Sequence, residues 1–265
     1  MGKKKRDEYL QNHVFCAVHQ TFIFFPMRII EYLPERPYSI DGIKAILRKN
    51  SDDILFFTPN AEKEIEKRLT MYDYETFVDV GANIGKFSLR IANDYKHKSV
   101  DVIAIEAHPE TYRALSKNIE CNSLKNIEAV NTAITDHQGV VTLYENRVGD
   151  RINVANHFHH RDSSIRNVFD EKDSTQVKSD TLDNILSGRK VHVMKIDVEG
   201  AEVLALNGAT NTLKHVRLII VEIHGDNYEN VKQILERHAF NLEVIGNTKP
   251  STDIRCSIGH IIGSK

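Results

Sequence analysis

Short apolar strands alternate with helical segments along most of this chain. From residue 76 onward, runs of four to six apolar or β-branched residues are each followed by a segment with the 3.6-residue period of a helix. Strands are expected at 76–80, 100–105, 127–130, 191–196 and 218–223, and helices at 84–93, 109–121, 199–206 and 228–238. Strand–helix alternation with right-handed crossovers predicts an α/β fold: a doubly wound, mostly parallel sheet with helices on both faces.

Three other segments complete the expected organisation. Residues 242–245 and 256–262 read as a closing antiparallel pair, and residues 61–69 read as a charged helix that begins the domain. Residues 1–60 carry four of the six prolines and show no clear alternation, so we expect an N-terminal extension or cap before a domain spanning 61–265.

A polar insertion interrupts the alternation at about residues 134–180. Within it, 139–144 and 174–178 read as two partner strands, and the residues between them, 147–173, are rich in His, Arg and Asn. Long polar loops at the carboxyl edge of a sheet are usually functional or disordered. We expect this one to contact substrate.

Composition excludes several classes of protein. The net charge of −2 argues against a chain that binds polyanions over its whole surface, and three distant cysteines without a CxxC pair argue against a disulfide framework or cysteine zinc site. We expect a cytoplasmic protein.

The basic start at Lys3–Arg6 precedes an apolar stretch, 14–33, that polar residues interrupt. An amphipathic cap helix is therefore favoured over a membrane segment, although peripheral contact with anionic lipid stays open.

The first chemical motif is a glycine turn between an expected strand and helix. Asp79, Gly81 and Gly85 follow a DxGxxxG spacing, and glycines allow the backbone a tight turn and a close approach to a ligand. The following helix N-terminus favours a carboxylate or phosphate. Asp79 is placed to accept the ammonium group of an amino-acid ligand, directly or through water. The alternative is a purely structural turn.

The second motif is an acid at the end of the next strand. Glu106 lies 21 residues after Gly85, about the separation at which an acid in dinucleotide-binding folds hydrogen-bonds ribose hydroxyls. The nicotinamide fingerprint GxGxxG is absent from the preceding turn. The spacing therefore favours an adenosyl ligand other than a nicotinamide dinucleotide.

Two further strand ends carry a cluster of acids and one histidine. Asp197 and Glu199 follow the 191–196 strand, and Glu222 and His224, two residues apart, share one face of the 218–223 strand. A carboxylate near an imidazole suits a general base for a hydroxyl nucleophile, and a salt-bridged structural pair is the alternative. We expect Glu202 to do no more than charge the first turn of its helix.

These stretches together resemble the FkbM family of S-adenosylmethionine-dependent methyltransferases. The similar blocks are FVDVGANIGKFSL, VIAIEAHPETYRALSKNIECN, MKIDVEGAEVLALNGA and IIVEIHG, within residues 76–225, and the last two are the more specific. Thr181-Leu182-Asp183 is also similar to the family's short acidic helix entry, whereas Lys86 stands where the family often has an aromatic residue.

The resemblance implies a Rossmann-like class I methyltransferase fold with a seven-stranded sheet. It also implies S-adenosyl-L-methionine as cofactor, its methionine part near Asp79, Gly81, Asn83 and Gly85, its ribose on Glu106, and its adenine near Ala133. Ala82, Ala107 and Asp197, beside these residues, complete the expected cofactor set. Family members act on hydroxyls of sugars and polyketides, so we expect O-methylation of a sugar, glycan or small metabolite.

Several points of mechanism stay open at this stage. Either Asp197 or His224 is the expected base, with Glu199 and Glu222 orienting it. No metal is expected, although Asp197, Glu222 and His224 offer a metal-assisted alternative. A nucleotide-dependent Rossmann enzyme of another class and a nucleic-acid methyltransferase are the rival functions. The second rival would use basic residues of the insertion: His157, His159, His160, Arg161 and Arg166.

Overall fold

A seven-stranded sheet organises the chain. The computed structural model describes residues 36–40, 42–48, 53, 62–96, 98, 100–148, 151–158, 174–246 and 257–265. In spatial order the strands are β12 (Asn241–Ile245), β13 (Ser257–Ser264), β11 (Leu218–His224), β10 (Val193–Ile196), β3 (Thr76–Val80), β4 (Asp101–Ile105) and β5 (Ile127–Val130). β13 runs antiparallel to both neighbours and the other pairs are parallel, which confirms the mostly parallel sheet and its closing antiparallel pair.

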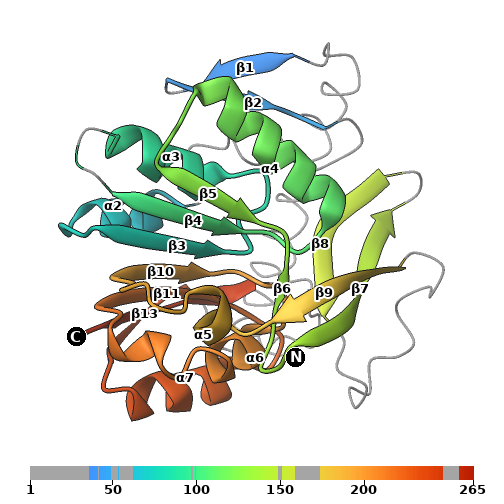
Figure 1. The fold of residues 1–265 in the computed structure, drawn as a ribbon. Coiled ribbons are helices and arrows are strands. Elements are labelled where there is room, and N and C mark those ends of the chain that lie inside the picture. Colours follow the sequence, from blue (N-terminus) through green and yellow to red (C-terminus); the bar gives the residue numbers. More distant parts are fainter. Residues whose placement is uncertain are drawn as a thin grey trace, which may run out of the picture.

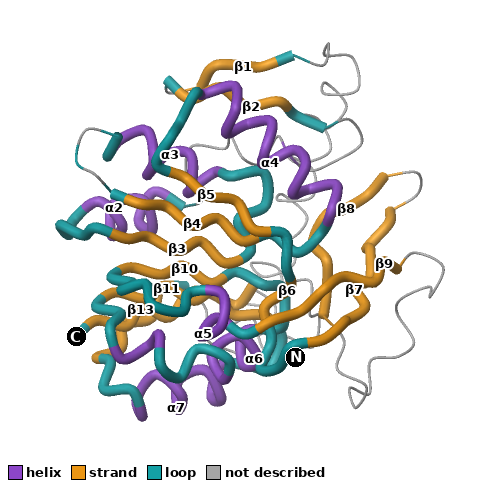
Figure 2. Tube along the Cα trace, viewed as in Figure 1, coloured by secondary structure: helices purple, strands orange, loops and turns teal. Residues whose placement is uncertain are grey.

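Helices cover both faces of this sheet (Figures 1 and 2). On one face lie α2 (Lys63–Thr70), α3 (Lys86–Asp94) and α4 (Pro109–Asn122), and on the other lie α5 (Leu182–Ile185), α6 (Glu202–Asn207) and α7 (Tyr228–Arg237). A 3-10 turn, η2 (Thr212–Lys214), precedes β11. The expected Rossmann-like arrangement is therefore observed.

Side chains that alternate between the two faces of the sheet form two hydrophobic cores, one on each face. Val78 of β3 faces the core with α5, α6 and α7, whereas its neighbour Phe77 faces the core with α2 and α3. Both side chains are fully buried. Because successive strand residues point to opposite faces, a strand covered on both sides must be apolar throughout, as 218–221 is.

A second, four-stranded sheet stands at the carboxyl ends of the parallel strands (Figure 1). Its order is β6 (Ala133–Ile134), β9 (Ser174–Asp180), β7 (Gly139–Val148) and β8 (Arg151–Phe158). β7 and β9 pair antiparallel, as predicted for 139–144 and 174–178. β8 shows that part of the expected polar loop is strand. His159, His160, Arg161 and Arg166 lie outside the described residues, as does the side chain of His157.

The described part of the N-terminal extension is a hairpin, which the sequence did not predict. β1 (Pro37–Ile40) and β2 (Ile43–Ile46) pair antiparallel through a turn at Gly42. The Asn122 Oδ1 atom of α4 accepts a hydrogen bond from Lys44 N at 2.8 Å, and Asn118 Oδ1 accepts one from Ile46 N at 2.7 Å. The hairpin is therefore bound to α4. The basic start and the 14–33 stretch lie outside the described residues.

Helix boundaries differ from the expected ones most clearly at α6. The sequence predicted a helix from residue 199, but α6 begins at Glu202, because Glu199 (φ +50°) and Gly200 (φ +103°) are left-handed.

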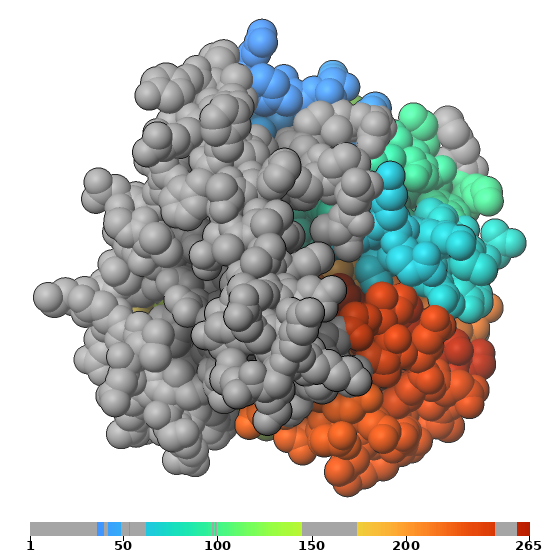
Figure 3. Space-filling model, turned by 180° about the vertical axis from the view of Figure 1, so that it is seen from behind, coloured from blue at the N-terminus to red at the C-terminus, as the bar shows by residue number. Residues whose placement is uncertain are grey.

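At the back of the molecule the early and late parts of the domain meet (Figure 3), where Arg68 Nη2 of α2 lies 2.7 Å from Glu243 Oε1 of β12. Among the described residues, no helix has both the length and the apolar character that crossing a membrane requires.

Candidate active site

A cavity lies at the carboxyl ends of β3, β4 and β10. The space between its lining residues amounts to about 600 Å³, including space open to solvent. Six residues predicted from the sequence line it: Gly81, Asn83, Glu106, Ala107, Asp197 and Glu199. Thr132 and Ile134, the neighbours of Ala133 that the resemblance placed near the adenine, also line it, and the remaining lining residues were not predicted: Val80, Ile105, Thr111, Leu143 and Val198.

The glycine turn brings the ends of β3 and β10 close together. Gly81 has φ +80°, and a Cβ there would lie 1.7 Å from the carbonyl oxygen of Asp197. Gly81 N and Ala82 N both donate to Ile105 O of β4 at 2.9 Å, and left-handed Asn83 (φ +51°) follows them. The turn is therefore fixed to both neighbouring strands, and only glycine fits its first position.

Glu106 lies in the wall of the cavity, and backbone donors hold its carboxylate in place. Oε2 accepts a hydrogen bond from Asn83 N, and Oε1 accepts one from His108 N, both at 2.9 Å. Burial raises the pKa of Glu106 to about 7, and the two backbone N–H groups oppose the rise. Each carboxylate oxygen has a further lone pair, so the side chain is able to receive a vicinal diol from the cavity.

Asp79 lies under the turn rather than in the cavity wall. Its Oδ2 accepts hydrogen bonds from Ser88 N at 3.1 Å and Ser88 Oγ at 2.6 Å, which tie β3 to α3. Its Oδ1 is buried and has no hydrogen-bond partner among the described residues. Burial raises the pKa of Asp79, and Lys195 opposes the rise. An unpartnered buried oxygen fits the predicted contact with an ammonium group, directly or through water.

Three other predicted cofactor residues support the cavity from behind. Ala82 packs with Ala104 and Leu115, and a Cβ on Gly85 would lie 2.7 Å from Leu115 Cδ1. Ala133 is fully buried beside Leu143, while its neighbours Thr132 and Ile134 line the cavity. The neighbours of Ala133, rather than Ala133 itself, therefore face the cavity.

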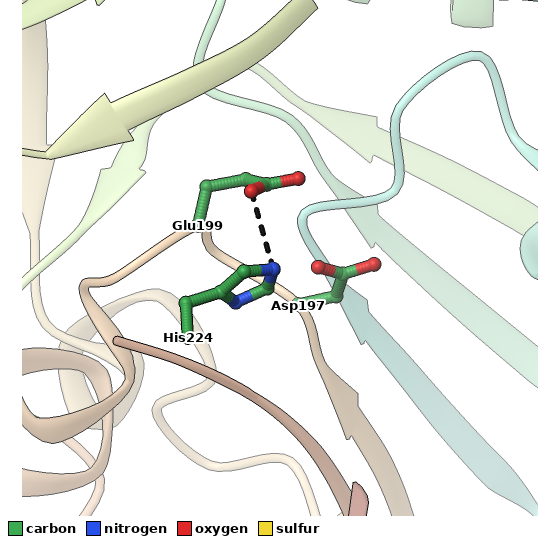
Figure 4. A group of neighbouring side chains, drawn as sticks. All are labelled: Asp197, Glu199 and His224. Atoms are coloured by element: carbon green, nitrogen blue, oxygen red, sulfur yellow. Dashed lines mark ion pairs between the residues drawn. The ribbon is translucent and has the colours of Figure 1, made fainter. Parts of the chain in front are cut away.

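Asp197, Glu199 and His224 lie close together (Figure 4), and the first two line the cavity. His224 Nε2 lies 3.2 Å from Glu199 Oε2 and 3.9 Å from Glu222 Oε1. Its other ring nitrogen, Nδ1, lies 2.9 Å from Glu202 Oε1. Both nitrogens of the imidazole therefore face carboxylates. Asp197 is held separately, by Lys195 Nζ at 3.0 Å from its Oδ2.

Glu202 does more than the sequence suggested. Its side chain is fully buried and also accepts hydrogen bonds from Gly200 N at 2.8 Å and Asn227 Nδ2 at 2.5 Å. It therefore anchors the left-handed turn that carries Glu199 and fixes the orientation of the His224 ring. Burial alone would lower the pKa of His224, but Glu199 and Glu202 raise it to about 10.

The carboxylates of this cluster differ in their proton affinity. Burial, followed by the nearby Glu222 charge, raises the pKa of Asp197 to about 6 against the effect of Lys195. Burial raises the pKa of Glu199 to about 8. Burial would also raise the pKa of Glu222, but His260, 3.4 Å from Glu222 Oε2, holds it well below its usual range. Asp197 and Glu199 are thus the acids of the cluster that titrate near neutral pH.

The same cluster has the composition of a cation site. Asp197, Glu199 and His224 each offer one ligand atom within 4.8 Å of the others. The metal-assisted alternative drawn from the sequence had Glu222 in place of Glu199. The ion pairs of His224 satisfy its imidazole without a cation, so the geometry is compatible with either state.

Comparison with known proteins identifies the family. The model of the methyltransferase FkbM domain matches residues 79–242, which include the turn, Glu106 and the acid cluster. The chain belongs to the FkbM methyltransferase family. This confirms the resemblance drawn from the sequence motifs.

Relatives of this FkbM methyltransferase come from fungi and archaea. "Methyltransferase 1" of Beauveria bassiana is 25% identical over 226 residues, covering 75% of this chain and 90% of that protein. "Hexuronic acid methyltransferase AglP" of Haloferax volcanii is 27% identical over 170 residues, covering 63% of each. Among solved structures, a methyltransferase FkbM from Methylobacillus flagellatus aligns with a TM-score of 0.48 at 15% identity, over 74% of this chain and 46% of that one.

Some site residues gave no sequence signal. Arg48, next to the hairpin, donates to Thr111 Oγ1 through Nη1 at 2.7 Å and to Asn83 Oδ1 through Nη2 at 3.5 Å. Asp53 holds the same guanidinium at 2.6 Å. The N-terminal extension therefore reaches two residues of the cavity wall, and no motif in residues 1–60 indicated this.

Proposed function

We propose that this chain is an S-adenosylmethionine-dependent O-methyltransferase that acts on a hydroxyl of a sugar, glycan or small metabolite. The observation that carries the proposal is the placement of a diol-accepting carboxylate, Glu106, and a candidate base, Asp197, in one cavity. Family membership and the AglP relative, whose name specifies a hexuronic acid, support the acceptor class.

The cofactor assignment depends on three features of the cavity. Gly81 and Asn83 place backbone at its wall, the unpartnered Oδ1 of Asp79 lies behind them, and Glu106 presents its carboxylate from the next strand. Bound S-adenosylmethionine would supply an electrophilic methyl group on a positively charged sulfur. Asp197 lines the cavity with a pKa of about 6, and its negative charge at pH 7 favours such a cation electrostatically.

Asp197 is the base that we assign to the acceptor hydroxyl. It lines the cavity, whereas both ring nitrogens of His224 are held by carboxylates. During methyl transfer an Asp197 carboxylate oxygen would accept the proton that the acceptor hydroxyl loses. Lys195 and Glu222 fix the charge environment of Asp197, and His224 positions Glu199. Alignment and proton transfer together provide the catalysis.

Calorimetry and a methyl-transfer screen test the cofactor and the acceptor. S-adenosylhomocysteine should bind, and radiolabelled methyl should transfer to uronic acids, glycans or hydroxylated metabolites rather than to RNA. Glu106→Gln should weaken binding, whereas Glu110→Gln, an exposed acid in the first turn of α4, should leave it unchanged. Absence of binding to the intact protein, or transfer to RNA alone, contradicts the proposal.

The role of Asp197 is tested by Asp197→Asn with Asp226→Asn as the control. Asp226 is an exposed acid just beyond β11. Asp197→Asn should lower kcat by about 10²–10⁴-fold, with S-adenosylhomocysteine affinity changed far less. Unaltered turnover in Asp197→Asn would remove the base assignment while leaving the cofactor site intact.

A further inference from the structure

A second depression lies at the opposite edge of the central sheet. It encloses about 880 Å³, including space open to solvent, and is lined by residues that precede four parallel strands. Tyr74 precedes β3, Lys98 precedes β4, Lys190 and His192 precede β10, and Arg217 precedes β11. A five-residue strand, roughly 16 Å long, separates this edge from the cofactor cavity. The depression therefore belongs to neither the cofactor site nor the acid cluster.

Two buried side chains line this depression, and one of them carries an unpartnered polar atom. Tyr74 and His192 are each only 6% exposed; the Tyr74 hydroxyl interacts with the Tyr95 hydroxyl, whereas His192 Nδ1 has no hydrogen-bond partner among the described residues. Native proteins rarely leave buried polar atoms unpaired, and those that remain often mark a site for a ligand, ion or water. Burial, followed by the nearby Arg217, lowers the pKa of His192.

Cations dominate the rim. Lys98, Lys190 and Arg217 stand there against two acids, Asp73 and Glu75. Lys98 Nζ lies 3.7 Å from Asp73 Oδ1, an acid whose side chain is 97% exposed, so water largely screens that pair. Arg217 Nη2 donates to the Asp73 carbonyl at 3.2 Å, which fixes the guanidinium at the rim. The positive excess and the guanidinium fork suit an anion with several oxygens.

We propose that this depression is a binding site for a phosphate group, on a small organic molecule or as the free ion, separate from the methyl-transfer site. Arg217 and Lys190 contact the phosphate oxygens, and Tyr74 and His192 complete the hydrogen bonds from below. The aromatic rings of Tyr74 and Tyr95, whose centroids lie 5.2 Å apart, offer an apolar surface to an organic group that carries the phosphate.

Amide NMR titrations of the full chain test this site. Inorganic phosphate and adenosine monophosphate are titrated separately at constant ionic strength, which distinguishes the free ion from a carried phosphate. Saturable shifts are expected for His192, Arg217 and neighbouring amides in at least one arm. Arg217→Gln and Lys190→Gln should each weaken binding by at least about tenfold, as expected for the loss of one charge-assisted hydrogen bond. Lys214→Gln, an exposed cation of η2 outside the depression, should leave binding unchanged.

Tyr74→Phe separates binding from folding. Because Tyr74→Phe keeps the buried ring and removes only its hydroxyl, it should weaken phosphate binding with little change in the melting temperature. S-adenosylhomocysteine binding, measured on the same variant, serves as the control that the cofactor cavity at the opposite edge of the sheet is intact. Shifts that do not saturate in either arm, or binding that Arg217→Gln, Lys190→Gln and Tyr74→Phe all leave unaltered, would overturn the proposal.

Discussion

The carbonyl oxygen of Asp197 occupies the position that a side chain on Gly81 would need. A Cβ at Gly81 would lie 1.7 Å from that oxygen and 2.8 Å from its carbon, and φ at Gly81 is +80°. The turn after β3 and the candidate base after β10 are therefore packed directly against each other. A substitution at Gly81 must move one of the two backbone segments.

Gly81→Ala should consequently impair both folding and cofactor binding. The left-handed backbone alone costs about 1–2 kcal/mol for an alanine, and the clash adds to it. Gly188→Ala is the matched control, since Gly188 has φ +76° but nothing within 4 Å of its added Cβ. Urea unfolding and S-adenosylhomocysteine calorimetry on both variants measure the difference. Equal losses in the two would show that backbone strain, rather than contact with Asp197, governs the position.

Cofactor binding should depend on pH through Glu106. Burial raises the pKa of this carboxyl to about 7, so it is mostly protonated below pH 6 and ionised above pH 8. Only the ionised form accepts hydrogen bonds through all its lone pairs, so S-adenosylhomocysteine affinity should rise by about tenfold from pH 6 to pH 8. Calorimetry across this range measures it, and Glu106→Gln should flatten the profile. A flat profile in the wild-type protein would contradict the ribose assignment.

Glu202→Gln should destabilise the protein near neutral pH and do so less at high pH. His224, whose pKa is raised to about 10, gains stability from its carboxylate partners while protonated, and this stability is lost as pH rises through 10. Replacing its buried partner should cost about 2–4 kcal/mol at pH 7. Urea unfolding at pH 7 and pH 10.5 checks this, with Glu236→Gln, an exposed acid of α7, as the control. A cost that stays constant with pH would mean that His224 is not the group involved.

Much of the fold was predictable because it depends on local periodicity. Thr76–Val80 and Ile127–Val130 match their predicted strands to the residue, since β-branched and aliphatic runs bounded by polar residues specify buried strands. The start of α6 was predicted wrongly, because Glu199 adopts a left-handed conformation that its residue type does not favour. Buried Glu202 holds that turn, and this contact exists only in the folded chain.

The site was predictable where a residue stands at a strand end, and not where it arrives from elsewhere. Glu106 and Asp197 could be placed because parallel strands bring their carboxyl ends to one edge. The contact between Arg48 and Thr111 joins residues 63 apart, and no periodicity encodes such a pairing. The 37–46 hairpin was missed for the same reason, since its packing depends on the amides of Asn118 and Asn122 in α4.

Arg48→Ala should weaken cofactor binding, although Arg48 belongs to the N-terminal extension and to none of the sequence motifs. Its guanidinium bridges Asp53, Thr111 and Asn83, and its charge lowers the pKa of Glu106. Loss of these bonds should raise the dissociation constant of S-adenosylhomocysteine by about 5–20-fold. Arg90→Ala, a helix α3 position outside the cavity lining, is the control. Unchanged affinity in Arg48→Ala would restrict the extension to a structural role.

Methyl transfer should persist after exhaustive chelation. Both ring nitrogens of His224 already face carboxylates, at 3.2 Å and 2.9 Å, and Lys195 already neutralises Asp197. A cation at Asp197, Glu199 and His224 would have to displace the His224–Glu199 pair. Turnover is measured before and after treatment with a strong chelator, and again after Mg²⁺ or Mn²⁺ is added back. A loss that either ion restores would instead assign activation of the hydroxyl to a metal, because a bound cation lowers the pKa of an oxygen ligand as a base would not.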